Sequence, residues 1–175
     1  LLVNTVGSWE KRPQAHTDCR TPGILLNSGS LGQTLSKCCG LALTTDERIV
    51  ALLGDGELQE GQCWEALMTL HRRRLSNLLV IVDRNGIQSD STVQDIKPIP
   101  DLEGALTALG LAVRVVDGQD VAQLARCFTE LTRPRRPTVI LADTRKGAGV
   151  FFMEARTCPP RGYAWHGRVP DRDEY

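Results

Sequence analysis

The sequence lacks several features that define other classes of protein. Its formal net charge at pH 7 is +0, because Lys and Arg are as frequent as Asp and Glu. Balanced charge gives no reason to expect a nucleic-acid partner, since nucleic acids are bound through an excess of basic residues. No apolar run approaches the roughly 20 residues that a membrane-spanning helix requires. We therefore expect neither a nucleic-acid-binding protein nor a membrane protein.

The sequence also lacks the motifs of common metal, redox and nucleotide sites. Its cysteines form no Cys-x-x-Cys pair and no Cys/His spacing typical of zinc sites. The absence of Gly-x-Gly-x-x-Gly and of Gly-Lys-Ser/Thr after a strand argues against a generic nucleotide-binding domain. Reduced cysteines and the lack of a secretory signal favour a cytoplasmic protein. The chain begins with Leu1 rather than Met, so we expect it to be trimmed at its N-terminus.

What is present is an alternation of apolar strands and amphipathic helices. We expect a single α/β domain over residues 1–175, because a chain of this length can bury a sizeable core. The alternation predicts a doubly wound, mostly parallel sheet with helices on both faces. The expected strands cover residues 48–53, 78–82, 111–116 and 138–142, and the expected helices cover residues 28–43, 60–73, 101–109 and 120–131. The apolar stripe of the second helix is expected to hold Trp64, Leu67, Met68 and His71.

The central part of the chain is a strand, helix, strand unit. Its first strand, residues 48–53, is followed by a Gly-Asp-Gly turn that contains Asp55, and its second, residues 78–82, is followed by a turn that contains Asn85. The crossover of such a unit is almost always right-handed, so both strands end at the same edge of the sheet. Asp55 and Asn85 should therefore meet where open α/β sheets bind their ligands.

The residue types at this edge suit a hard cation. Asp55 offers a carboxylate, Asn85 an amide oxygen, and Ile87 a backbone carbonyl, which are the oxygen ligands that Mg²⁺ or Ca²⁺ prefers. Gly54 and Gly56 allow the backbone to approach a large anion closely. The alternative is an ordinary pair of turns, because Asp-Gly and Asn-Gly are common turn sequences.

A second glycine-rich loop precedes the first helix. Ser28 or Ser30 can cap this helix. Gly29 and Gly32 expose backbone N–H groups at its positive end, which is a natural seat for an anion.

Together these motifs resemble the thiamine diphosphate motif, and more closely its transketolase branch. The stretches Gly54-Asp-Gly-Glu-Leu-Gln-Glu-Gly and Asn77-Leu-Leu-Val-Ile-Val-Asp-Arg-Asn-Gly-Ile87 are similar to the separately encoded N-terminal subunit of split transketolases. The resemblance extends from about residue 16 to residue 175. It implies the thiamine diphosphate-binding fold, with thiamine diphosphate and Mg²⁺ as cofactors. Asp55, Asn85 and Ile87 would hold the metal, and Gly54 and Gly56 would lie against the diphosphate.

The resemblance also assigns roles to the loop before the first helix. Gly29, Leu31 and Gly32 would lie against the cofactor, with Leu31 touching the thiazolium region. Thr34 replaces a family glycine and would crowd the cofactor or tilt the start of the helix. Lys146 either contacts a phosphate or caps the end of a strand.

Three further residues gain catalytic roles from the resemblance. His16 would point at the hydroxyls or carbonyl of the substrate, and His166 would lie by the diphosphate and move protons there. Glu60 would face the opposite half of the dimer and take part in a proton relay between sites. Without the resemblance, His16 is a surface histidine, His166 belongs to a packed Trp-His pair, and Glu60 compensates the helix dipole.

The function implied is that of a transketolase, which moves a two-carbon ketol unit from a ketose donor to an aldehyde acceptor. In the family, the glutamate that activates the cofactor's aminopyrimidine ring comes from another domain. We therefore expect a separate C-terminal transketolase subunit as partner, in a complex of two copies of each. Two alternatives stay open: a relative with a non-sugar acceptor in specialised metabolism, and a non-catalytic interaction subunit that keeps the fold.

Overall fold

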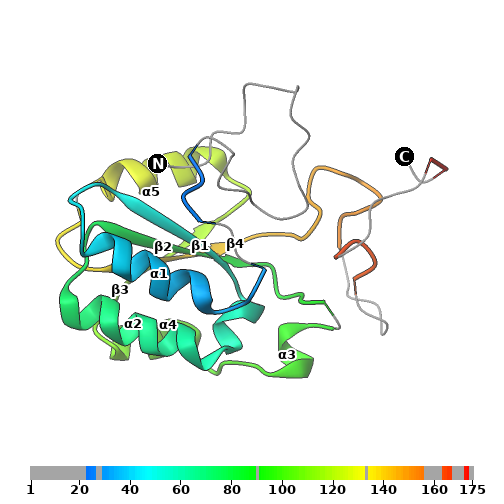
Figure 1. The fold of residues 1–175 in the computed structure, drawn as a ribbon. Coiled ribbons are helices and arrows are strands. Elements are labelled where there is room, and N and C mark those ends of the chain that lie inside the picture. The colour runs from blue at the N-terminus through cyan, green and yellow to red at the C-terminus, as the bar shows by residue number, and fades with distance from the viewer. Residues whose placement is uncertain are drawn as a thin grey trace.

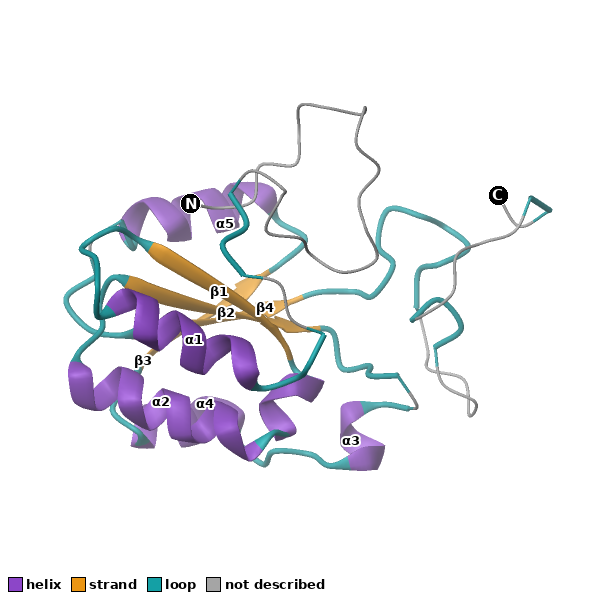
Figure 2. Cartoon of the chain, in the orientation of Figure 1, coloured by secondary structure: helices purple, strands orange, loops and turns teal. Residues whose placement is uncertain are grey.

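The computed structural model describes residues 23–26, 29–89, 91–132, 134–155, 163–166 and 172–173. These residues form a sheet with helices on both of its faces (Figures 1 and 2). The strands are β1 Ile49–Gly54, β2 Leu78–Arg84, β3 Ala112–Asp117 and β4 Thr138–Asp143. The α-helices are α1 Gln33–Ala42, α2 Gly61–Arg73, α3 Val93–Ile96, α4 Leu102–Ala108 and α5 Val121–Glu130, and a 3₁₀ helix, η1, covers Gly56–Gln59.

The strands lie in the order β1-β2-β4-β3, and every pair of neighbours is parallel. Gly54 at the end of β1 pairs with Asp83 of β2, and Arg84 of β2 pairs with Asp143 of β4. The carboxyl ends of β1, β2 and β4 therefore meet at one edge. The prediction of a doubly wound α/β sheet is confirmed.

The larger core lies between the sheet and helices α1, α2 and α4. In α2 the buried residues are Cys63, Ala66, Leu67 and Leu70. The expected stripe was therefore wrong in part, because Met68 and His71 are exposed. Both stripes share Leu67 and have helical spacing, and the buried one contacts α1, where the Sγ–H of Cys39 donates to the carbonyl of Ala66 at 3.6 Å.

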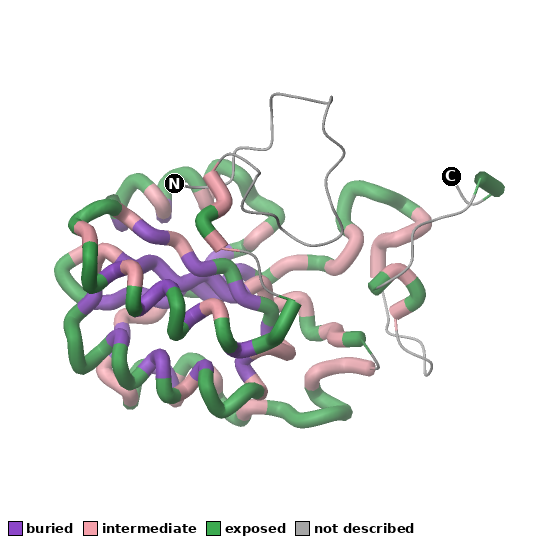
Figure 3. Tube along the Cα trace, viewed as in Figure 1, coloured by how far each residue is buried: buried purple, intermediate pink, exposed green. Residues whose placement is uncertain are grey.

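The other face of the sheet has a smaller core, which is covered by α5 (Figure 1). Buried residues follow the central strands, while Leu52 of β1 is 65% exposed (Figure 3). None of the helices in the described part of the chain has the length and apolar character to cross a membrane.

Candidate metal and cofactor site

The candidate site lies where β1 and β2 end. Asp55 directly follows β1 and is only 6% exposed. Its Oδ1 accepts a hydrogen bond from the N–H of Gly56 at 2.8 Å, and its Oδ2 accepts one from the N–H of Gly86 at 2.6 Å. Gly86 follows Asn85 in the loop after β2. The structure therefore brings Asp55 and the Asn85 loop together, as the strand, helix, strand unit predicted.

The electrostatic environment of Asp55 works against its ionised form. Burial raises the pKa of Asp55, and the negative charge of Asp83 adds to this effect. The hydrogen bonds from Gly86 and Gly56, and the positive charge of Lys146, lower the pKa. A bound cation would offset the cost of holding this carboxylate ionised away from water.

The donor set at this edge fits Mg²⁺ with a diphosphate. Asn85 Oδ1 accepts a hydrogen bond from the N–H of Ile87 at 3.0 Å, so the loop turns between these two expected ligands. In the described part of the chain, no group of three or more His, Cys, Asp or Glu could hold a metal by itself. A carboxylate with amide and carbonyl oxygens would leave positions around a bound Mg²⁺ open for phosphate oxygens and water.

The glycines around Asp55 leave room for such a ligand. A Cβ built on Gly54 or on Gly86 would meet no other atom within 4 Å. A Cβ on Gly56 would lie 2.7 Å from Oε1 and 3.1 Å from Cβ of Gln88, so a larger residue would require the Gln88 side chain to move. Sequence reasoning missed Gln88, because nothing in the motif marks the side chain that covers Gly56.

The loop before α1 is docked on the same edge. Gly32 is the N-cap residue of α1, with a left-handed φ of 80°, so the cap is neither Ser30 nor the undescribed Ser28. The N–H of Gly32 donates to Oε1 of Glu57 at 2.8 Å. The expected anion-binding site at the start of α1 is therefore occupied, at this N–H, by the carboxylate of Glu57.

The other residues of this loop face solvent. Gly29 is exposed and Leu31 is 58% exposed, so both are accessible to a ligand. Thr34 is half-buried in the first turn of α1. Their contacts with a cofactor stay predictions.

Glu60 is the N-cap residue of α2 and its side chain is exposed. The side chain makes no capping hydrogen bond, so it does not compensate α2 in that way. Its aliphatic part lies against Gly32, where an added Cβ would come within 2.8 Å of Glu60 Cβ. The role of Glu60 in a proton relay stays a prediction.

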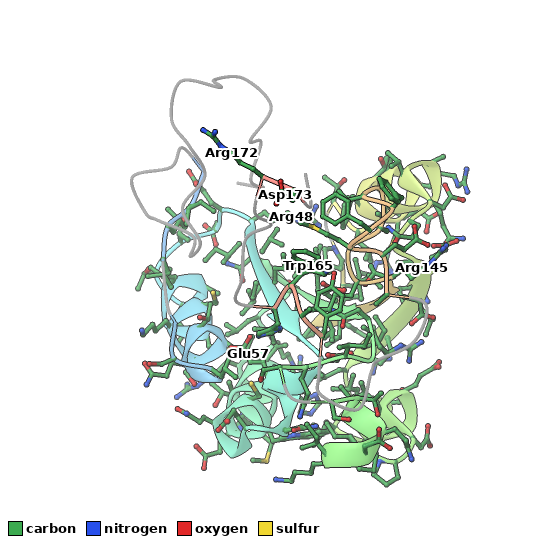
Figure 4. All side chains as sticks on the ribbon, turned by 90° about the vertical axis from the view of Figure 1, so that its right-hand side faces the viewer. Arg48, Glu57, Arg145, Trp165, Arg172 and Asp173 are labelled. Atoms are coloured by element: carbon green, nitrogen blue, oxygen red, sulfur yellow. The ribbon has the colours of Figure 1, made fainter. Side chains whose placement is uncertain are left out.

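His166 lies in a turn after the sheet, and His16 lies outside the described residues. The N–H of His166 donates to the carbonyl of Tyr163 at 3.1 Å, and His166 is exposed. The neighbouring Trp165 packs edge-on against Phe152, with ring centroids 5.4 Å apart (Figure 4). Trp165 is thus packed, while the proton-transfer role of His166 stays a prediction.

Lys146 lies close to the same turn. Its Nζ is 5.4 Å from the ring centroid of Tyr163, and its carbonyl accepts the N–H of Ala155 at 2.8 Å. The Tyr163 hydroxyl donates to the carbonyl of Met153, which closes the segment on itself. The structure therefore gives Lys146 a cation–π contact that neither sequence-based alternative included.

The site thus combines a parallel α/β sheet with a carboxylate and an amide at the ends of two adjacent strands, which is the arrangement expected of a thiamine diphosphate-binding protein. The family described as "Transketolase, thiamine diphosphate binding domain" matches residues 4–158 of this chain. The chain belongs to this family.

Curated relatives include proteins that are named as single subunits of transketolases. The chain is 36% identical over 160 residues to an apulose-4-phosphate transketolase subunit of Actinobacillus succinogenes, covering 89% of this chain and 56% of the relative. It is 37% identical over 162 residues to the 6-deoxy-6-sulfo-D-fructose transketolase subunit SqwG of a Clostridium species, covering 89% and 59%. The chain thus spans less than two thirds of the length of these relatives.

Solved structures agree with this assignment. The transketolase of Campylobacter jejuni superposes with a TM-score of 0.69 at 28% identity, covering 77% of this chain and 23% of that one. The transketolase of Leishmania mexicana superposes with a TM-score of 0.65 at 27% identity, covering 71% and 21%. The prediction of the thiamine diphosphate-binding fold is confirmed.

Proposed function

We propose that this chain is the cofactor-binding N-terminal subunit of a split transketolase. Together with a separate C-terminal subunit, it transfers a two-carbon ketol unit from a ketose donor to an aldehyde acceptor. The observation that carries this proposal is the buried Asp55 carboxylate, which is joined to the Asn85 loop through the N–H of Gly86. The relatives whose names describe one subunit of a transketolase support the division into two chains.

The chain's own residues would hold the cofactor at the edge of the sheet. Asp55, Asn85 and the carbonyl of Ile87 would hold Mg²⁺, and through it the diphosphate. Thiamine diphosphate, when bound, supplies the nucleophilic carbon and electron sink for breaking and forming a carbon–carbon bond beside a carbonyl. The exposed side chain of Leu31 would form an apolar wall beside the thiazolium.

Proton transfer is assigned to the histidines and Glu60. An imidazole nitrogen of His16 would orient the substrate's oxygens, and one of His166 would take or give a proton near the reacting carbonyl. Glu60 would face the second half of the assembly. These roles follow from the positions in the family motif that the residues occupy.

The names of the relatives guide the choice of substrates. One is named for a sugar phosphate and another for a sulfonated fructose, so both names contain a sugar with an anionic group. We propose a ketose donor with an anionic group for this chain as well. A panel of phosphorylated, sulfonated and neutral ketoses, offered with several aldehydes, tests this proposal by mass spectrometry of the products.

The cofactor proposal is tested by calorimetric titration of the full-length protein with its partner subunit. Thiamine diphosphate should bind saturably when Mg²⁺ is present and should lose its affinity when EDTA removes the metal. The lone chain should show no turnover, since half of the site comes from the partner. If thiamine diphosphate shows no saturable binding under any condition, the chain is instead a non-catalytic subunit that has kept the fold.

A further inference from the structure

The carboxylates of Asp55 and Glu57 connect the turn after β1 to two other segments of the chain. The Asp55 carboxylate accepts a hydrogen bond from the N–H of Gly86, which lies 31 positions later. The Glu57 carboxylate accepts one from the N–H of Gly32, which lies 25 positions earlier. Segments 29–32, 55–57 and 85–87 are thereby joined at one edge of the sheet. Only the first of these two contacts belongs to the metal site proposed above.

Glu57 is itself held firmly. It lies in the 3₁₀ helix η1, and its carbonyl accepts both the N–H of Glu60 at 3.1 Å and the Sγ–H of buried Cys63 at 3.3 Å. The next residue, Leu58, is 1% exposed, and its carbonyl accepts the indole N–H of Trp64 at 2.8 Å. The Glu57 backbone is therefore fixed between the Asp55 turn and α2, and its carboxylate accepts the hydrogen bond from the N–H of Gly32.

The partner of this carboxylate is equally constrained. Gly32 is buried and has a left-handed φ of 80°, which L side chains rarely adopt. A Cβ on Gly32 would lie 2.8 Å from Glu60 Cβ, so the backbone of this loop lies directly against the start of α2. The contact therefore needs glycine on one side and a side chain of the length of Glu57 on the other.

The contact is also favoured electrostatically. The N–H of Gly32 is among the first donors of α1, whose N-terminus carries a partial positive charge. A hydrogen bond from a backbone N–H to an ionised carboxylate is stronger than one between neutral groups. Glu57 thus occupies the end of α1 as an internal anion.

We propose that Glu57 is a positioning residue, which holds residues 29–32 against the Asp55 turn so that Leu31 is presented to the cofactor. Only the second half of this proposal, the presentation of Leu31 to the cofactor, rests on the proposed function. The first half, that Glu57 holds the start of α1, concerns the protein without any cofactor. The two halves can therefore be tested separately.

The first test is hydrogen–deuterium exchange of the cofactor-free, full-length protein, followed on the peptide that contains residues 29–35. Glu57→Ala removes the acceptor and should speed exchange in this peptide about tenfold, because a hydrogen bond to a charged group is lost. Glu57→Gln keeps an oxygen acceptor of the same length and should stay within about threefold of the wild-type rate. Glu65→Ala, at an exposed position of α2, is the matched control and should change nothing.

The second test is the affinity of the same variants, with the partner subunit, for thiamine diphosphate with Mg²⁺. Glu57→Ala should weaken the affinity about tenfold, whereas Glu57→Gln and Glu65→Ala should not. Glu57→Asp, which keeps the charge but shortens the reach, should behave like Glu57→Ala and replaces it if that variant does not fold.

The outcomes separate the two halves. Unchanged exchange in both Glu57→Ala and Glu57→Asp would overturn the contact's positioning role. Faster exchange with unchanged cofactor affinity would overturn the link to the cofactor. A wild-type protein that binds no thiamine diphosphate would overturn the proposed function, while the exchange result would still decide whether Glu57 holds α1.

Discussion

The ends of β1 and β2 and the segment after β4 both belong to the proposed site, but the chain holds them differently. At the first, Asp55 is 6% exposed and accepts two backbone N–H groups. At the second, His166 is exposed, and the ion pair between Arg145 and Glu154 and the ring contact of Trp165 join exposed and half-buried residues. The sheet itself therefore positions the proposed metal ligands, whereas the histidine segment depends on weaker surface contacts.

Truncating a core side chain beside Asp55 should have the largest effect on stability. Leu53→Ala removes a side chain that is 1% exposed in β1 and should lower the free energy of unfolding by about 2–5 kcal/mol. Phe151→Ala removes a side chain that is 90% exposed and should change it by less than about 0.5 kcal/mol. Urea denaturation measures the free energy of unfolding of both variants. Equal losses would contradict the claim that the β1 end is held more firmly than the segment after β4.

An added methyl group should distinguish two glycines of similar backbone conformation. Gly86 has a φ of 74° and Gly149 a φ of 91°, and an added Cβ would meet no atom within 4 Å at either. Gly86→Ala should cost about 1–2 kcal/mol of stability, because the bond to Asp55 fixes that backbone. Gly149→Ala should cost less, since the surface turn can adjust. Thermal unfolding of both variants tests this, and the reverse order would contradict it.

The smallest expected effect concerns the reactivity of the buried thiol of Cys63 in α2. Burial raises the pKa of Cys63 to about 11, and the charges of Glu57 and Glu60 act in the same direction. Because the folded-state pKa is raised, this thiol favours folding fully below its unfolded pKa, and the contribution is lost as the pH rises from there through about 11. Cys63 should therefore resist iodoacetamide at pH 8 until the protein is unfolded, as measured by mass spectrometry. Rapid alkylation of the folded protein would show that this end of the core opens.

The sequence allowed the site at β1 and β2 to be predicted because a parallel crossover leaves few choices. Once Asp55 and Asn85 end adjacent strands, the direction of the chain places them at one edge. The buried stripe of α2 was harder to predict, since two stripes of equal spacing exist and tertiary packing chose the one without Met68. The Glu57 contact was missed because its partner is a backbone N–H, which carries no sequence signal.

The histidines show why the remainder of the site could not be predicted from this chain. His166 lies in a surface turn whose position is not determined by strand pairing, and the role proposed for Glu60 would depend on a partner subunit. Resemblance to the family supplied both roles, and physical reasoning from the residues did not.

We propose above that Asp55 holds Mg²⁺ against the diphosphate of thiamine diphosphate. The most direct measurement is a calorimetric titration of thiamine diphosphate with Mg²⁺ against the full-length protein and its partner, comparing Asp55→Ala with Asp46→Ala, an exposed aspartate before β1. We expect Asp55→Ala to weaken binding about 100-fold or more and Asp46→Ala to leave it unchanged. Equal affinity in the two variants would contradict the account.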